Sequence, residues 1–167
     1  EDKAAAREKF VSALRGPSSE KAEATLDGRG VVELVSQKGF GFSPIYQTHI
    51  VESTHFKTVL GFEHFEEIVE EINQFADSVE PYTQNSTTTP SALLCCVYRF
   101  LSMGIQRQQL KSLLEHDDNV FIRCAGFLFV RFGVPPDQMW SWVGDYILDT
   151  DTLRFGKDAE GPMTVGE

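Results

Sequence analysis

The chain has 167 residues, of which 41% are hydrophobic, so it can form one ordinary globular domain with a sizeable core. Acidic residues outnumber basic ones by 25 to 15, and the formal net charge of −10 disfavours sequence-independent binding to a phosphate backbone, which depends on lysine and arginine. Its 3 cysteines form neither an even disulfide framework nor a metal-ligand spacing, so we expect reduced thiols in an intracellular compartment.

The first 43 residues are predicted to be an N-terminal extension with little regular structure. A short helix is expected at residues 4–14, followed by a linker that contains Gly-Pro-Ser-Ser. The apolar run Val31–Val35 fits either a short strand or part of a helix, because its periodicity does not decide between them. All apolar runs of the chain are too short to cross a bilayer. Since the chain begins at Glu1 rather than methionine, we expect it to be a piece of a longer protein.

From residue 44 onward the pattern of apolar residues is helical. Two short helical pieces are expected at 44–52 and 53–60. Apolar residues then recur at helical spacing from Phe62 to Val79, while glutamates occupy the other faces. This pattern predicts an amphipathic helix with a solvated acidic side.

The next helix is expected to begin at Thr89-Pro90, because threonine can cap a helix and proline suits its first turn. Gly104 is expected to end that helix. An amphipathic helix follows at 106–115.

The stretch at about 118–132 is predicted to be the central, buried helix of the domain. Apolar residues occupy nearly every angle around it. An aspartate such as Asp118 is expected to cap its head, and Gly133 lies just past its tail. Ala125 and Gly126 should let a neighbouring backbone approach closely. We therefore expect other helices to surround this one.

A last helix is predicted to begin at Pro135-Pro136, and residues 149–167 are expected to form mostly loop or a small hairpin. Connections between the later helices are short, which favours neighbours that pack side by side. The predicted fold is an all-α, single multi-helix domain with an irregular N-terminal segment.

Five residues are candidates for contact with a partner protein. Arg123 and Arg131 are the polar exceptions on the central helix, and they either form salt bridges within the chain or anchor acidic residues of a partner. Trp140 and Trp142 project to different sides of their helix, so we expect one in the core and one as an exposed anchor. Asp118, at the head of the central helix, completes the set.

The motif Lys38-Gly39-Phe40-Gly41-Phe42 gives an alternative function. It matches the start of the aromatic motif with which RRM domains stack RNA bases on a strand. Lys38, Phe40 and Phe42 would then form a single-stranded RNA-binding module. Ser43-Pro44 interrupts the pattern where a strand should continue, and no second aromatic strand follows.

His116-Asp117-Asp118, with Cys124 nearby, could combine a thiol nucleophile with a histidine base. Because Cys124 lies on a helix that is expected to be buried, we interpret it as an inert thiol of the core. The aspartates are better explained by capping of that helix. We therefore expect no catalytic residues and no enzyme activity.

Cys95 and Cys96, together with His116, are the candidates for a metal site. Adjacent residues point about 100° apart on a helix, so both thiols would not reach one ion, and no Cys-x-x-Cys pair is present. There is also no phosphate-binding loop or dinucleotide fingerprint. We expect neither a metal nor a cofactor, which leaves interaction as the default role.

Several stretches match one known family in residue type, order and spacing. They are Ser53-Thr54-His55-Phe56, Phe65–Ile72, Thr89–Leu94, His116–Arg131, Pro135-Pro136, Trp140-Ser141-Trp142 and Met163–Glu167. From about Ile45 to Glu167 the chain thereby resembles the pre-mRNA-splicing factor 38 family, and its B-type branch more than the founding member. His55 stands where the family usually has tyrosine.

The resemblance implies an all-helical, non-enzymatic scaffold of the spliceosome. Members of the family act around tri-snRNP joining and activation, and their domain docks helical or extended segments of other splicing proteins. By this likeness the chain is expected to be nuclear, without a cofactor and monomeric on its own. It would contact RNA only indirectly, within the ribonucleoprotein.

Two departures from the family pattern affect the domain assignment. Residues 1–43 have no match, which agrees with an N-terminal extension. The chain also ends at Glu167, where the family continues into further helices. We therefore expect 44–167 to be a domain truncated at its C-terminus, with a groove left open where those helices would pack.

Overall fold

A computed structural model describes residues 30–36, 39–153 and 163–164, so the helix expected at residues 4–14 lies outside the described part. Within those ranges the chain forms seven α-helices and one two-stranded ribbon, which confirms the all-α class. None of these helices combines the length and the apolar character that a membrane span requires. The helices are α3 (Pro44–Glu52), α4 (Thr54–Leu60), α5 (Phe65–Phe75), α6 (Ala92–Met103), α7 (Arg107–Leu114), α8 (Val120–Gly133) and α9 (Pro136–Val143).

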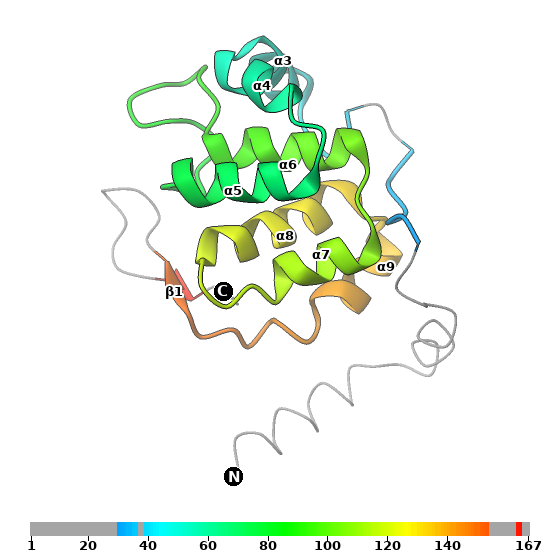
Figure 1. Cartoon of the computed structure of the whole chain (residues 1–167). Helices are drawn as coiled ribbons and strands as arrows, with labels where there is room; N and C mark the ends of the chain where they lie inside the picture. The colour runs from blue at the N-terminus through cyan, green and yellow to red at the C-terminus, as the bar shows by residue number, and fades with distance from the viewer. Residues whose placement is uncertain (1–29, 37–38, 154–162, 165–167) are drawn as a thin grey trace.

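In Figure 1, α3 and α4 lie at one end, followed by α5 and α6 and then by α7 and α8, with α9 and the segment leading to β1 beyond them. Helix α8 packs against α5, α6, α7 and α9, so it lies at the centre of the later helices as expected. Its residues Ala125, Phe129 and Val130 are completely buried. The apolar side chains of α8 are therefore buried by several neighbouring helices.

The head of α8 differs from the prediction at one point. Asn119, not an aspartate, is the N-cap, and its side-chain oxygen accepts a hydrogen bond of 2.8 Å from the backbone N–H of Phe121. Asn119 has the extended backbone that a cap residue needs. The expected capping role of Asp118 is therefore wrong, and Asp118 lies exposed in the preceding turn.

Close approach of α7 to α8 occurs at Gly126, as predicted. A Cβ atom added to Gly126 would lie 3.1 Å from the backbone nitrogen of Leu114. This is tighter than nine in ten real Cβ contacts, so a side chain at this position would require α7 to shift by a few tenths of an ångström.

The start of α6 also differs from the prediction. Ser91 caps the helix by accepting a hydrogen bond from the N–H of Leu94, and Thr89-Pro90 lies before the helix. Pro90 instead forms an isolated bridge with Tyr82, because the loop between them folds back on itself. The predicted end is confirmed: Gly104 has a φ of 72° and donates its N–H to the carbonyl of Phe100.

Helix α5 is shorter than predicted. It begins at Phe65 and ends at Phe75, although apolar residues continue at helical spacing before and after it. At its head the Glu67 carboxylate accepts the backbone N–H groups of His64 and Glu63 at 2.9 and 3.0 Å. The hydrogen bond from His64 is the main reason that the pKa of Glu67 lies below its usual value. The cap therefore favours a charged Glu67.

Residues 30–36 form neither a helix nor a strand, apart from an isolated bridge between Val31 and Gln106, so neither alternative considered for Val31–Val35 is confirmed. The N–H of Val32 donates to the carbonyl of Ile105 at 2.9 Å, and the N–H of Val35 donates to that of Gly133 at 2.7 Å. Val32 is buried by this docking. At the other end of the chain, β1 (Thr152–Leu153) pairs antiparallel with β2 (Met163–Thr164), in agreement with the expected small hairpin.

Candidate partner-binding site

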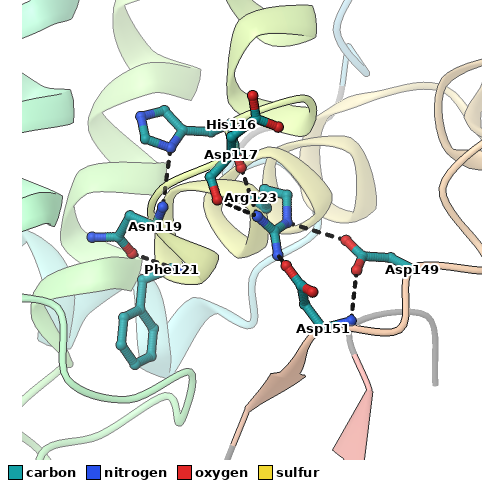
Figure 2. A network of polar contacts seen from close by, with 7 residues as sticks. All are labelled: His116, Asp117, Asn119, Phe121, Arg123, Asp149 and Asp151. Carbon is teal, nitrogen blue, oxygen red and sulfur yellow. Dashed lines mark hydrogen bonds and ion pairs between the residues drawn. The ribbon is translucent and has the colours of Figure 1, made fainter.

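Arg123 is the most buried charged residue in the described part of the chain, at 6% exposure, and it forms a network with four other residues (Figure 2). Its Nη1 donates to the carbonyl of His116 at 2.6 Å and to that of Asp117 at 3.4 Å. Its Nε pairs with Asp149 at 3.1 Å, and its Nη2 pairs with Asp151. We call these five residues the Arg123 network.

The network joins three parts of the fold. Arg123 belongs to the first turns of α8, while the two carbonyls belong to the connection that follows α7. Asp149 and Asp151 follow α9, and Asp149 accepts the N–H of Asp151 at 2.9 Å, which holds the two carboxylates near the guanidinium. Buried charges are stable when they are paired and hydrogen-bonded in this way. The Arg123 network therefore fixes the segment after α9 to the central helix.

Sequence reasoning placed Asp149 and Asp151 in a loop and assigned them no role. The pairing with Arg123 spans 26 and 28 residues of sequence. Spacing along a helix cannot reveal such a contact. The available signal was the unpaired arginine on an otherwise apolar helix, which required an acidic partner somewhere in the chain.

Arg131 lies two turns beyond Arg123 on the same helix but in a different environment. It is exposed, and its guanidinium lies 5.8 Å from the ring centroid of Phe132. The two arginines therefore do not form one polar strip, because the segment that covers Arg123 does not cover Arg131.

The tryptophans of α9 lie on different sides, as expected. Trp142 is half-buried and packs against the core, and the Arg107 guanidinium lies 5.7 Å from its ring. Trp140 is 41% exposed. Trp140 is thus the candidate residue whose large apolar surface is open to a partner.

Residues 39–42 form a turn rather than the strand that the RNA-stacking motif requires. Phe40 has a φ of 56° and contacts the edge of Tyr98, and Lys38 lies outside the described residues. Phe42 is buried and stacks on Phe132 at a centroid distance of 4.0 Å. The two phenylalanines therefore do not present a shared face of flat rings.

The thiol of Cys124 is buried, and this burial raises its pKa to about 11. The Nδ1 atom of His116 accepts the N–H of Asn119 at 3.2 Å, so this nitrogen is already used in the connection before α8. Cys95 is also buried, with its pKa raised to about 11, and its sulfur lies 3.7 Å from the hydroxyl of Ser53. Among the described residues, no three His, Cys, Asp or Glu side chains are placed to hold a metal ion.

We expect iodoacetamide to leave Cys124 unmodified in the native chain at about pH 8, because a buried thiol with a raised pKa supplies almost no thiolate. Mass spectrometry of tryptic peptides measures the modification, and the chain unfolded in denaturant is the control in which Cys124 should react fully. Rapid alkylation of the native chain would contradict the burial and restore the thiol-enzyme interpretation.

Comparison with known proteins agrees with the resemblance noted above. Residues 35–166 match the model of the PRP38 family, and this match begins upstream of the expected start at Ile45. The pre-mRNA splicing factor SR-like 1 of Arabidopsis thaliana is 29% identical over 144 residues, which cover 86% of this chain and 34% of that protein. The human pre-mRNA-splicing factor 38B is 26% identical over 151 residues, covering 79% of this chain and 28% of that protein.

A solved structure also resembles the chain. It is a chain of the Snu23–Prp38–MFAP1(217–258) complex of Chaetomium thermophilum, with a TM-score of 0.67 and 20% identity, covering 75% of this chain and 66% of that one. At this identity the likeness supports the fold. The chain spans about a third of the length of the relatives it matches in sequence. Because the family match covers most of its residues, the chain belongs to the PRP38 family.

Proposed function

We propose that this chain is a non-enzymatic protein-binding domain of the nuclear splicing machinery, which acts as a scaffold around tri-snRNP joining and activation. The family match over residues 35–166 is the observation that carries this proposal. The matched plant and vertebrate relatives are named as pre-mRNA splicing factors, and the structural relative comes from a complex with Snu23 and a segment of MFAP1.

The chemistry of the described residues supports protein binding over catalysis or direct RNA binding. The thiols that could act as nucleophiles are buried with raised pKa values. The net charge of −10 disfavours phosphate contacts, and the ring of Phe42 is already stacked within the core. Other splicing proteins are therefore the proposed partners, with RNA contacted only through them.

A pull-down from nuclear extract tests this function. The tagged 167-residue chain is expected to enrich spliceosomal proteins, as measured by quantitative mass spectrometry after nuclease treatment removes RNA-mediated recovery. An unrelated helical domain of similar size and net charge is the control for non-specific capture. If the chain recovers no splicing protein above that control, the proposed function is wrong.

A further inference from the structure

Residues 30–36, blue in Figure 1, satisfy backbone groups at the ends of two helices. The carbonyl of Gly30 accepts the N–H of Arg107, the first residue of α7, at 2.9 Å. The carbonyl of Gly133, the last residue of α8, accepts the N–H of Val35 at 2.7 Å. Groups at helix ends have no partner inside the helix. Residues 30–36 therefore cap α7 and α8, and we call them the N-terminal strap.

Val32 anchors the N-terminal strap. It is only 4% exposed, and its N–H donates to the carbonyl of the buried Ile105 at 2.9 Å. Val31, the residue before it, is 66% exposed, although its backbone forms a bridge with Gln106. The attachment thus depends mainly on one buried side chain and on backbone hydrogen bonds. Segments with so few buried contacts open at a lower free-energy cost than the core.

Helix α9 is held less firmly than the other described helices. None of its residues is fully buried, whereas each of the other six helices has at least two buried residues. Helix α8 is the helix that it packs against most. Elements with few buried apolar contacts have low local stability. Contacts from outside α8 therefore contribute a large part of what holds α9 in place.

The N-terminal strap supplies two such contacts. Glu33 accepts a hydrogen bond of 2.8 Å from the side-chain amide of Gln138, in the first turn of α9. The strap also holds the backbone of Arg107, whose guanidinium lies 5.7 Å from the ring centroid of Trp142 in α9. The strap therefore contacts the start of α9 directly and its later part through Arg107.

The core helices have many contacts of their own. Helix α6 packs against α4, α5 and α8, and α7 packs against α8. Phe100 on α6, Leu110 on α7 and Phe129 on α8 are completely buried. Loss of the strap is therefore expected to affect α9 more than the core.

We propose that the N-terminal strap controls the docking of α9 on α8. With the strap attached, α9 is held against the domain; with the strap detached, α9 loosens while the core stays folded. Residues 1–29 continue directly from the strap, so a protein or a modification that engages them would act on α9 through it. The strap is thus a regulatory device for the helix that carries Trp140 and Trp142. It concerns the chain alone and does not depend on the proposed function.

Two measurements on the 167-residue chain follow the strap and α9 separately. Both tryptophans of the chain lie on α9, so tryptophan fluorescence reports on this helix alone. Hydrogen exchange followed by mass spectrometry reports on the strap, on α9 and on the core helix α5 through separate peptides. The N–H groups that Val32 and Val35 donate make exchange in the strap peptide a measure of attachment.

Val32→Asp places a charge in the buried site of the strap and is expected to detach it. Exchange should then become at least about ten-fold faster in both the strap and α9, without change in α5. Acrylamide should also quench the tryptophans more strongly. Val31→Asp is the matched control, because it adds the same charge to the neighbouring valine at an exposed site. Its exchange and quenching should equal those of the original chain.

Fast exchange in the strap with unchanged exchange and quenching in α9 would overturn the proposal, because α9 would then be held without the strap. Equal effects of Val31→Asp and Val32→Asp, or unchanged exchange in the strap of Val32→Asp, would contradict the role of Val32 as the anchor and with it the proposal.

The milder variant Val32→Ala supplies the test if Val32→Asp also speeds exchange in α5. Exchange should again rise in the strap and in α9 together, without change in α5. A rise in the strap alone would contradict the proposal. Faster exchange in α5 with both variants would show that the strap is part of the core, and the proposal would then be wrong.

Discussion

Replacing Phe129 with alanine is expected to lower the free energy of unfolding by about 3–5 kcal/mol, as is typical of a buried aromatic deletion. Phe129 is completely buried and is one of the largest such side chains in the described structure. It lies on α8, which contacts α5, α6, α7 and α9, so few neighbours can move to fill the space. Equilibrium denaturation with guanidinium chloride, followed by circular dichroism, measures the change.

Phe75→Ala provides the matched control, because it removes the same side chain from a site that is 55% exposed. Its expected cost is below about 1 kcal/mol. A loss below about 1 kcal/mol for Phe129→Ala would show that α8 is not the centre of the core.

Replacing Arg123 with alanine is also expected to cost about 3–5 kcal/mol, because removing one partner of a buried ion pair leaves the other uncompensated. The side chain of Asp149 is only 17% exposed, so its charge would lose its partner in a largely dry site. The carbonyls of His116 and Asp117 would lose their donor as well. Arg123→Lys should lower the free energy of unfolding by less than Arg123→Ala does, since lysine keeps the charge but not the planar fork of donors.

Arg131→Ala is the matched control for Arg123→Ala, since the two residues share a helix and a charge. Arg131 is exposed, and its replacement should change the free energy of unfolding by no more than about 0.5 kcal/mol. Equal losses for the two arginines in the same denaturation experiment would mean that the Arg123 network does not stabilise the fold.

Much of the fold follows from periodicity and turn chemistry. Helices α3, α4, α7 and α8 lie within a few residues of the expected ranges, because their apolar residues fit one face or one buried core. The helix starts were harder to place where several capping residues are adjacent. Asp118 and Asn119 can both cap a helix, and local sequence does not show which of the two takes the N-cap position that Asn119 has in the structure.

The pairing of Arg123 could not be predicted for a different reason. Helical spacing predicted Arg123 and Arg131 on one side of the central helix, but it carried no information about which of the two a later segment would cover. The covering segment follows α9, and its residues Asp149 and Asp151 approach the Arg123 guanidinium from outside α8 (Figure 2). Such a contact depends on the packing of complete helices.

The motif at residues 38–42 shows that a short sequence pattern typical of RNA binding can be present for another reason. Phe42 is conspicuous in the sequence, but its ring fills the space between Tyr46 and Phe132. Gly39 has a φ of 82°, so glycine is present there because of the turn that brings Phe42 into the core. Within residues 39–42 the motif thus serves a turn and core packing in this fold, whereas a strand would be needed to stack bases.

Cross-linking mass spectrometry of the chain in splicing complexes stalled at the tri-snRNP stage tests most directly whether it binds proteins within the spliceosome. Lysine-reactive cross-links are expected to join this chain to other splicing proteins, while ultraviolet cross-links to RNA are expected to be at background. Strong ultraviolet cross-links to RNA without protein cross-links would contradict the proposed scaffold function.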